Sequence, residues 1–381
     1  MGQPTNHRNP TSAYVHFPWC LKKCPYCDFA SGAVRREQVA HEAYAGAILT
    51  ELEARPTRDR TLVSVFFGGG TPSLWDPAAL GRVLAAIRGA FDREVDDLEV
   101  TVECNPTSID ARRAAALREV GVNRLSIGVQ SLDDERLRFL GRLHDADGAL
   151  RAVRGVAEVM DRVSGDLMFG MPGQTADDFA DEIDRLLDTG VEHVSAYSLT
   201  IEPETQFGAL HRKGKLPLAL EDDVADTFER AREVFAAAGF THYEVSNYAR
   251  PGAAARHNRH YWRGEDYLGL GAGAVGALDG RRYKNDPRPE GYLATPAAAE
   301  VFEERLTATE RVQEALMLGL RTDEGIAFGP VERRTGLDPR RGREDVIAKR
   351  AASGDLVVRD ERMIVPHARW LALDSIVADL F

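Results

Sequence analysis

Three of the four cysteines of this chain lie within the eight-residue segment Cys20-Leu-Lys-Lys-Cys24-Pro-Tyr-Cys27. A disulfide framework spreads an even number of cysteines along a chain, and a structural zinc site takes four protein ligands. A cubane iron–sulfur cluster instead takes one thiolate per iron, so three neighbouring cysteines would hold such a cluster and leave one iron open to another molecule. Two alternatives stay open, namely three buried structural thiols and a zinc site completed by His16 or His41.

The elements that must position these cysteines follow a strand–helix alternation from residue 13 to about residue 245. Apolar, β-rich stretches predict strands at Ala13–Phe17, Leu62–Phe67, Leu98–Glu103, Arg124–Ile127, Gly165–Met168 and His193–Ser198. Amphipathic stretches between them predict helices at Arg36–Ala54, Pro77–Phe91, Ser108–Glu119, Asp145–Arg162 and Ala176–Asp188. This α/β alternation predicts a parallel sheet with helices outside it, either open or curved into a partial (β/α)6 barrel of the TIM-like kind.

Unusual sequence clusters follow these strands, at the edge where chemistry is expected in a parallel sheet. The cysteine segment follows the first strand, Gly68-Gly-Gly-Thr-Pro72 follows the second, and Glu103-Cys-Asn-Pro106 ends the third. The remaining three strands end in Ser126–Gln130, Asp166–Pro172 and Tyr197. The sequence therefore places every such cluster on one rim.

The remainder of the chain has a different pattern, which divides the sequence into four parts. Residues 1–12 are expected to be disordered or extended, 13–250 to form the barrel, 251–300 to combine a Gly/His/aromatic segment with a linker, and 301–381 to form a C-terminal domain. The linker is expected at Asp279–Pro296, which contains Asp286-Pro-Arg-Pro289. Helical patterns around two short strands, Leu356–Arg359 and Arg362–Val365, resemble a winged-helix-like module.

The composition indicates a globular protein with a sizeable core. Of the 381 residues, 44% are hydrophobic and 28% charged, and 48 basic against 60 acidic residues give a net charge of −12. An acidic chain without long basic runs is not expected to bind nucleic acid. The first ten residues lack the apolar stretch of a secretory signal, and no apolar run approaches the length of a membrane span. We therefore expect a cytoplasmic protein.

The cysteine segment followed by Gly68-Gly-Gly-Thr-Pro72 resembles the radical S-adenosylmethionine (SAM) superfamily. This resemblance implies a [4Fe–4S] cluster on Cys20, Cys24 and Cys27, with the open iron binding the amino and carboxylate groups of SAM. It also implies that the glycines bind the SAM amino group, since a loop without Cβ atoms lets the backbone approach a small charged group. By position in the family motifs, the implied SAM-binding residues are Tyr14, Tyr26, Gly69, Gly70, Thr71, Glu103, Gln130, Arg142 and Asp166.

Longer stretches are similar to the branch that contains oxygen-independent coproporphyrinogen III oxidase and the HemW haem chaperones. They are Tyr14–Cys20, Leu125–Ser131, Asp166–Gln174 and Leu199–Thr205. The oxidase has a fourth cysteine two positions after the third and a long N-terminal extension, whereas here position 29 is Phe29 and 19 residues precede Cys20. Both differences favour a haem chaperone, which delivers haem to haem-requiring proteins. The alternative is radical decarboxylation of coproporphyrinogen III.

The chaperone resemblance implies further features of this chain. It implies recipients such as membrane respiratory enzymes, a homodimer favoured by the cluster, and SAM binding with or without SAM cleavage. The stretch His257-Asn-Arg-His260-Tyr-Trp262 resembles the His-Asn-x-x-Tyr-Trp stretch of the haem chaperones. Because imidazole is a good axial ligand and aromatic rings pack on porphyrins, His257, or His260 in its place, is the implied haem ligand. Hydrogen-bonded core histidines are the alternative.

Two other features are expected to be structural. Gly271-Ala-Gly-Ala-Val-Gly276 fits a GxGxxG pattern but does not open a helix in a βαβ unit, so we expect a close-packed turn near the rim rather than a dinucleotide site. Cys104 has no partner at the spacing of the other cysteines and is expected to be a small core residue.

Overall fold

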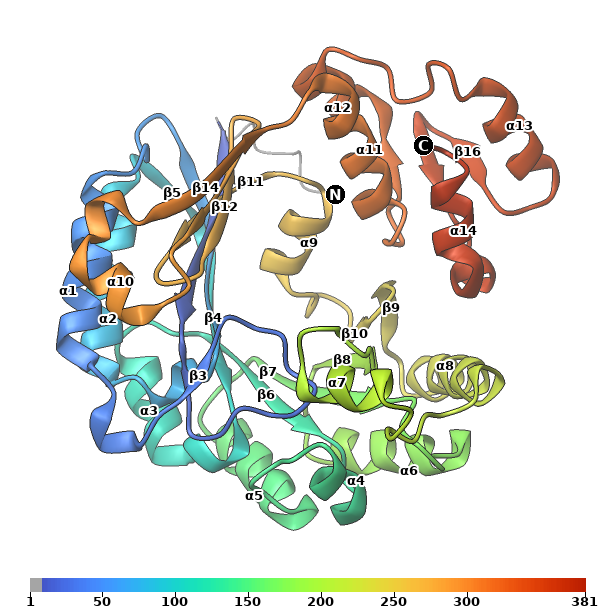
Figure 1. Cartoon of the computed structure of the whole chain (residues 1–381). Coiled ribbons are helices and arrows are strands. Elements are labelled where there is room, and N and C mark those ends of the chain that lie inside the picture. The colour runs from blue at the N-terminus through green and yellow to red at the C-terminus, as the bar shows by residue number, and fades with distance from the viewer. Residues whose placement is uncertain (1–8) are drawn as a thin grey trace.

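The computed structural model describes residues 9–381 and contains a curved parallel sheet with helices on its outer side (Figure 1). Six strands follow one another as parallel neighbours in chain order: β1 (Pro10–Phe17), β4 (Thr61–Gly69), β5 (Arg93–Cys104), β6 (Arg124–Gln130), β7 (Val163–Phe169) and β8 (His193–Ser198). The helices that connect them are α1 (His41–Glu53), α2 (Pro77–Ala90), α3 (Ala111–Glu119), α4 (Asp134–Phe139), α5 (Ala146–Ala157) and α6 (Ala176–Leu187). The predicted α/β fold is confirmed.

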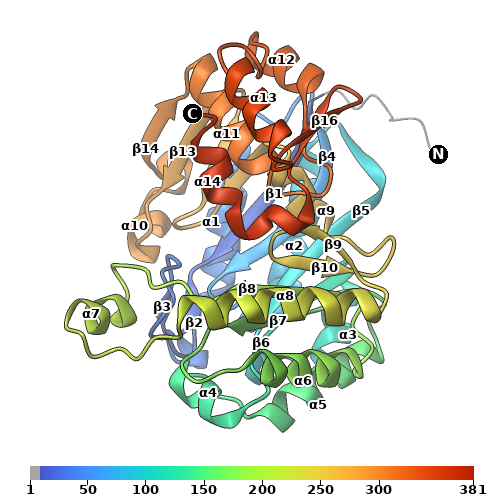
Figure 2. The same ribbon diagram turned by 90° about the vertical axis from the view of Figure 1, so that its right-hand side faces the viewer.

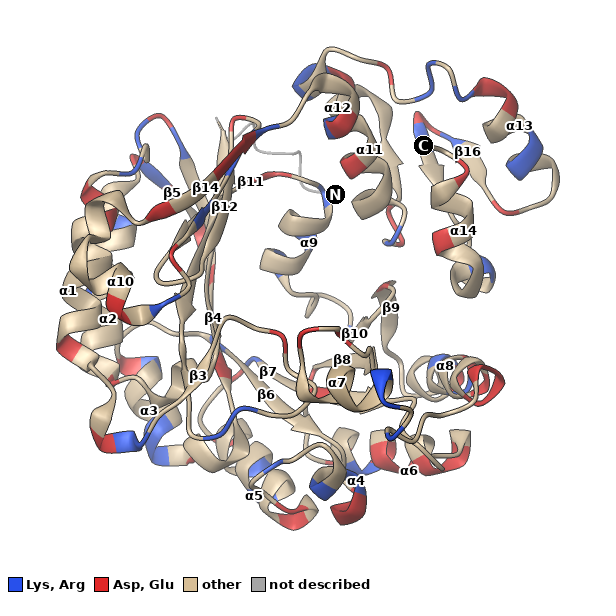
Figure 3. Ribbon diagram, viewed as in Figure 1, with Lys and Arg blue, Asp and Glu red and all other residues tan. Residues whose placement is uncertain are grey.

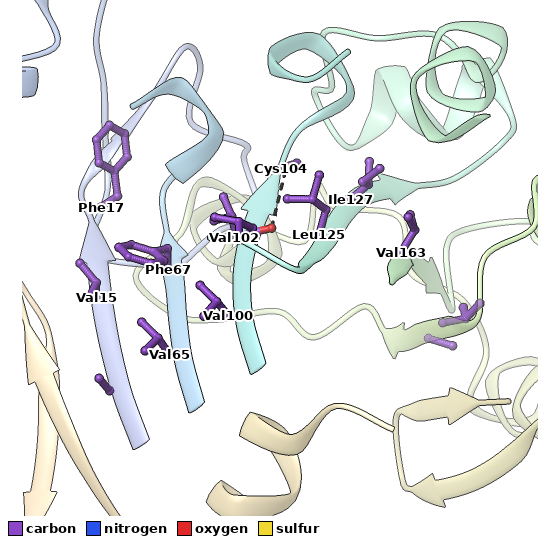
Figure 4. Close-up of a cluster of buried hydrophobic side chains, with 14 of the residues drawn as sticks. Val15, Phe17, Val65, Phe67, Val100, Val102, Cys104, Leu125, Ile127 and Val163 are labelled. Carbon is purple, nitrogen blue, oxygen red and sulfur yellow. Dashed lines mark hydrogen bonds between the residues drawn. The ribbon is translucent and has the colours of Figure 1, made fainter. Parts of the chain in front are cut away.

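The outer face of the sheet is apolar because alternate strand residues point toward the helices. Val65, Val100, Val102 and Leu125 are each at most 2% exposed, and Figure 4 shows such side chains in one cluster across neighbouring strands. Cys104 belongs to this cluster, so the prediction of a core cysteine is confirmed. The residues in between face the concave side and are largely polar, which leaves the interior of the partial barrel available for chemistry.

Acidic and hydroxyl side chains fix where the outer helices begin. Asp76, Asp110 and Asp145 accept backbone N–H groups of the first turns of α2, α3 and α5, and Thr175 forms a capping box with Asp178 at α6. These contacts satisfy N–H groups that have no partner within the helix. Each strand-to-helix loop at the rim is therefore held by a paired strand at one end and by a capped helix at the other.

The expected linker is wrong, because its residues belong to the main sheet. Strand β11 (Asp266–Leu270) pairs in parallel with β1, and β12 (Val275–Leu278), β13 (Arg281–Asn285) and β14 (Glu300–Arg305) extend the sheet antiparallel. The proline-rich stretch forms α10 (Pro289–Ala294). Since β1 would otherwise be an open sheet edge with unpaired backbone groups, these strands cover it.

The sequence predicts a disordered or extended N-terminus over residues 1–12. Residues 10–12 are extended, since they begin β1 and pair with β4. The expectation for residues 1–8 lies outside the described residues.

At the other edge, the sheet ends in two short antiparallel strands. β10 (Asn247–Ala249) pairs with β8 and with β9 (Thr241–Glu244), after α7 (Gln206–Arg212) and the long α8 (Glu221–Ala237). The short helix α9 (Arg256–Trp262) then crosses the concave side of the sheet before β11 (Figure 1). Helix α9 therefore occupies the inside of the partial barrel.

The C-terminal part is a helical unit with a small three-stranded sheet. It contains α11 (Ala308–Gly319), α12 (Phe328–Thr335), α13 (Glu344–Ala352) and α14 (Leu373–Ala378), with β15 (Ile326–Ala327), β16 (Val357–Arg359) and β17 (Arg362–Ile364). Strand β15 and helix α12 were not predicted. The unit lies on the side of the molecule that carries α8, β9 and β10 (Figure 2), where the Trp370 ring lies 4.5 Å from that of His242.

Charged residues of both signs are interspersed over the outer helices and the C-terminal unit (Figure 3). Among the described residues, no helix combines the length and the apolar character that crossing a membrane requires.

Candidate functional site

The three neighbouring cysteines lie on a loop that follows β1 and is closed by backbone pairing. The two-residue strands β2 (Trp19–Cys20) and β3 (Gly32–Ala33) pair with each other, and the ammonium group of Lys23 donates to the carbonyl groups of Phe29 and Ser31 at 2.9 and 3.0 Å. These contacts fix the conformation of the loop, and none of them involves a thiol group.

Two of the three sulfur atoms accept hydrogen bonds from residues far away in the sequence. The Thr71 hydroxyl donates to Cys20 Sγ at 3.4 Å, and Arg142 Nη1 donates to Cys24 Sγ at 3.6 Å. Burial raises the pKa of the Cys20 and Cys27 thiols. Donors directed at sulfur are suited to thiolate ligands, and hydrogen bonds to cluster sulfurs tune the potential of an iron–sulfur centre. The donor set therefore fits a cluster held by three thiolates.

The zinc alternative does not fit the positions of the two histidines. Both ring nitrogens of His16 are engaged, one with the Tyr14 hydroxyl and one with the Ala30 carbonyl, each at 3.0 Å. Nδ1 of His41 accepts the backbone N–H of Asp76 at 3.0 Å. Within residues 9–381, no group of three or more His, Cys, Asp or Glu side chains is placed to hold a single metal ion.

A cavity of about 480 Å³ lies beside the cysteines at the carboxyl ends of the strands. It is lined by Cys20, Cys24 and Cys27 and, among the predicted SAM-binding residues, by Tyr26, Gly69, Gly70, Thr71, Glu103, Gln130, Arg142 and Asp166. Tyr14 is not part of the lining; its ring lies 6.2 Å from Phe66, and its hydroxyl contacts His16. The structure thus brings together all of the predicted residues except Tyr14.

The glycine stretch is packed so closely that side chains are excluded. A Cβ atom at Gly70 would lie 2.5 Å from the Trp19 carbonyl oxygen, and one at Gly69 would lie 2.6 Å from the His16 ring. Gly69 also has a φ of 107°, which L-residues rarely adopt. The glycines therefore let the second strand loop contact the beginning of the cysteine loop.

Two carboxyl groups of the cavity have raised pKa values. Burial, with a further contribution from the nearby charge of Asp166, raises the pKa of Glu103 to about 8. Burial also raises the pKa of Asp166, which accepts the Ser126 hydroxyl at 3.0 Å. Glu103 accepts the backbone N–H of Gly69 at 3.0 Å. Both acids would be more easily ionised beside a cationic ligand, which suits the sulfonium and amino groups of SAM.

Arg142 and Gln130 are held by the end of β6. Arg142 is half-buried; its Nη2 donates to the Gly128 carbonyl at 2.7 Å, while its buried Nε has no hydrogen-bond partner in residues 9–381. Gln130 has a φ of 70° next to an irregularity in the pairing of β6 with β7. A left-handed backbone at a strand end is a feature of functional sites, and a buried guanidinium with a free donor suits the SAM carboxylate.

His257 and His260 lie on α9, inside the barrel. Glu99 accepts the backbone N–H groups of Arg256 and His257 at 3.1 and 3.0 Å and so fixes the first turn of the helix. The His257 ring stacks on Phe66 with centroids 4.9 Å apart, and its Nδ1 lies 2.9 Å from the Ser64 hydroxyl. Burial lowers the pKa of His257 to about 3, so its imidazole is neutral.

His257 and His260 differ in how many of their ring nitrogens are engaged in contacts. Nε2 of His260 contacts the Asp266 carbonyl at 2.7 Å, and its Nδ1 contacts the Glu265 carboxylate at 2.6 Å. No hydrogen bond to Nε2 of His257 is found among the described residues. Of the two candidate haem ligands, only His257 therefore retains an unengaged nitrogen.

The GxGxxG stretch forms the predicted close-packed turn, between β11 and β12. A Cβ atom at Gly271 would lie 2.5 Å from the His16 carbonyl oxygen. Since β11 runs parallel to β1, this turn lies at the same rim as the cysteine loop.

The cavity also contains residues that the sequence did not identify as part of the site. They include Asn105, Met168, Ser198, Thr200 and Glu202. Met168 on β7 pairs with Tyr197 on β8, two residues after the pair formed by Asp166 and Ser195. Because side chains alternate along a strand, Met168 lies on the same face as Asp166, and this alternation could have identified it from the sequence.

The chain is similar to known proteins over most of its length. Residues 14–186 match the family model "Radical SAM superfamily", and residues 306–367 match "HemN C-terminal domain". The chain is 36% identical to "Heme chaperone HemW" of Escherichia coli (strain K12), with 84% of this chain and 91% of that protein covered. It is 36% identical to "Heme chaperone HemW" of Synechocystis sp., covering 84% and 80%.

A mitochondrial relative and a solved structure are also similar. "Radical S-adenosyl methionine domain-containing protein 1, mitochondrial" of Mus musculus is 38% identical, with 86% of this chain and 77% of that protein covered. The solved structure described as "Coproporphyrinogen III oxidase (HemN) from Escherichia coli is a Radical SAM enzyme" has a TM-score of 0.81 and 22% identity, and the match covers 98% of this chain and 90% of that one. At this identity the structural match establishes the fold alone.

Proposed function

Because the chain belongs to the HemW haem chaperone family of radical SAM proteins, we propose that it binds haem and delivers it to haem-requiring proteins. The observation that carries this proposal is the similarity to HemW over most of the chain. The resemblance of the His257–Trp262 segment to the haem chaperones supports it. The structure adds that α9, which contains this segment, lies within the barrel beside polar side chains.

In this function Cys20, Cys24 and Cys27 would hold a [4Fe–4S] cluster, and the 480 Å³ cavity would hold SAM. When bound, the cluster supplies an open iron for the amino and carboxylate groups of SAM. Arg142 would bind the SAM carboxylate, Glu103 and Asp166 would accept hydrogen bonds from its ribose or balance its positive charge, and Gly69 to Thr71 would line its amino group. Tyr26 and Gln130 would complete the lining, and Tyr14 would support it from behind Phe66.

We further propose His257 as the axial ligand of the haem iron, with His260 as its substitute only if α9 rearranges. Binding of iron at Nε2 would leave the contact between Nδ1 and Ser64 intact, and that contact would orient the imidazole ring. His260 would first have to give up its contact with Glu265 or Asp266.

The experiment is anaerobic reconstitution of the cluster, followed by haem titration monitored by absorbance. The parent protein is expected to bind haem stoichiometrically with a shifted Soret band, and His257→Ala to bind more weakly with a different band. His211→Ala is the matched control, because His211 is exposed on α7 and does not line the cavity. Absence of stoichiometric binding by the parent protein would contradict the chaperone proposal.

Three accompanying proposals are a cytoplasmic location of this protein, haem transfer from it to a membrane respiratory enzyme, and a homodimer that depends on the cluster. They predict that the haem-loaded protein activates a haem-free acceptor and that reconstitution changes the molecular mass in solution. The competing activity, decarboxylation of coproporphyrinogen III, would be revealed by vinyl products together with 5′-deoxyadenosine. Phe29, which occupies the position of the fourth cysteine of the oxidase, is the feature that disfavours it.

A further inference from the structure

Thr101 on β5 and Arg124 on β6 are register partners on the concave face of the sheet. Their chain neighbours Val100, Val102 and Leu125 point to the outer core (Figure 4), so alternation directs Thr101 and Arg124 into the barrel. Both are buried, with exposures of 0% for Thr101 and 2% for Arg124.

The polar groups of both side chains lack partners. The Thr101 hydroxyl makes no hydrogen bond within residues 9–381. The Arg124 guanidinium likewise makes no hydrogen bond and no ion pair with any residue that the structure describes. Arg60, the other arginine that is buried among residues 9–381, differs in this respect, because it contacts Thr11, Asp266 and Asp279.

Glu99, a buried carboxylate on the same strand as Thr101, is already occupied as an acceptor. Its two carboxylate oxygens accept Arg162 Nη1 at 2.8 Å and the backbone N–H groups of Arg256 and His257. The charge of Arg124 lowers the pKa of Glu99, so the two groups interact across space without a direct hydrogen bond. Glu99 therefore balances the positive charge of Arg124 but accepts no hydrogen bond from its guanidinium group.

The charged and titratable groups around Arg124 come from several elements. Its charge opposes the rise that burial causes in the pKa of Glu103 and Asp166, and it adds to burial in lowering the pKa of His193 and His257. On β5, Thr101 lies between Glu103 of the SAM cavity and Glu99, which accepts the backbone N–H of His257, so its register partner Arg124 lies between the two sites.

We propose that Thr101 and Arg124 form a subsite for a carboxylate of the ligand that enters the barrel and, on the proposed function, for a propionate group of haem. A buried guanidinium without an acceptor is unfavourable, and a carboxylate accepts two parallel N–H donors from arginine. The Thr101 hydroxyl adds a third donor beside it. Because Arg124 is 2% exposed, the carboxylate reaches it only when α9 or its neighbours move.

The test compares haem with its dimethyl ester, in which both propionates are uncharged, by titration of the cluster-reconstituted protein. Loss of a buried charge pair costs enough that the parent is expected to bind haem at least about 30-fold more tightly than the ester. Arg124→Met is expected to reduce this ratio at least about tenfold. Thr101→Val, which removes one neutral hydrogen bond, should reduce it by about threefold.

Controls separate this inference from the proposed function and from misfolding. Because Arg124 has no hydrogen-bond partner, Arg124→Met leaves no group newly unpaired and should keep its cluster content. Arg124→Lys keeps the charge should the methionine variant not fold. Arg138→Met, at an exposed arginine on α4, should retain the full ratio.

Each possible result decides a separate question. If the parent protein fails to bind haem at all, the chaperone proposal fails. If it binds haem and the ester equally, or if Arg124→Met keeps the full ratio, then these donors are satisfied by water or by protein alone and the subsite is wrong.

Discussion

Glu51 on α1 should be among the residues most important for stability. Its side chain connects the barrel with residues 279–296, the segment that the sequence predicts to be a linker. Its side chain is 1% exposed and accepts hydrogen bonds from Gly271 N at 2.9 Å, Tyr292 Oη at 2.7 Å and Asn285 Nδ2 at 2.7 Å. It also forms an ion pair with Arg55. One carboxylate thus connects α1 with the turn after β11, with β13 and with α10.

Glu51→Ala removes the acceptor for all of these donors while they stay buried. Breaking a buried ion pair by removing one partner costs about 3–5 kcal/mol, and each further orphaned donor adds to that cost. Arg55 keeps its contact with Glu300, which limits the loss, so we expect about 4 kcal/mol. For a chain of this size that corresponds to a fall in the melting temperature of roughly 5 °C.

The assay is differential scanning calorimetry of the reconstituted protein at a fixed scan rate. Glu53→Ala is the control, because Glu53 is exposed on the same helix and should change stability by less than about 0.5 kcal/mol. Glu51→Gln keeps the shape without the charge and should fall between the two. If Glu51→Ala and Glu53→Ala melt within about 1 °C of each other, the network does not contribute as argued.

Three further predictions concern the cluster and SAM site. The pKa of Glu103 is raised to about 8, so its carboxyl group is protonated below that pH and ionised above it. Because the cationic SAM favours the ionised form, it should bind roughly tenfold more tightly at pH 9 than at pH 7, as measured by calorimetry. Arg142→Met removes a charge-assisted hydrogen bond to SAM and should weaken SAM binding about 10- to 100-fold. The same variant removes the hydrogen bond from Arg142 to Cys24 Sγ and should therefore lower the reduction potential of the cluster in voltammetry. Gly70→Ala places a methyl group 2.5 Å from the Trp19 carbonyl and should lower the iron content after reconstitution, whereas Gly89→Ala, with open space around it, should not.

The outcomes that would contradict these predictions are specific. A pH dependence of SAM binding that persists in Glu103→Gln would assign the titration to another group. Wild-type SAM affinity in Arg142→Met would remove this arginine from the site. Full iron incorporation in Gly70→Ala would show that the cysteine loop can shift away from the second strand loop.

The sequence alone determined the parallel sheet and the rim on which the site lies. Apolar runs and capping residues are local signals, and parallel strands bring their carboxyl ends to one edge whatever the details of packing. For that reason residues as distant as Cys20, Glu103 and Asp166 could be assigned to one cavity before its geometry was known.

Only the tertiary structure decided what happens after residue 250. Proline and aspartate cues around Asp286 are compatible with a linker, but long-range contacts with Glu51 place this segment in the sheet. The same holds for α9: the sequence resemblance implied His257 as the haem ligand with His260 as its substitute, whereas the contacts with Ser64 and Glu265 show how each ring is held. Such contacts join residues tens to hundreds of positions apart, so neither periodicity nor local propensity encodes them, and they exist only once the barrel has closed around the helix.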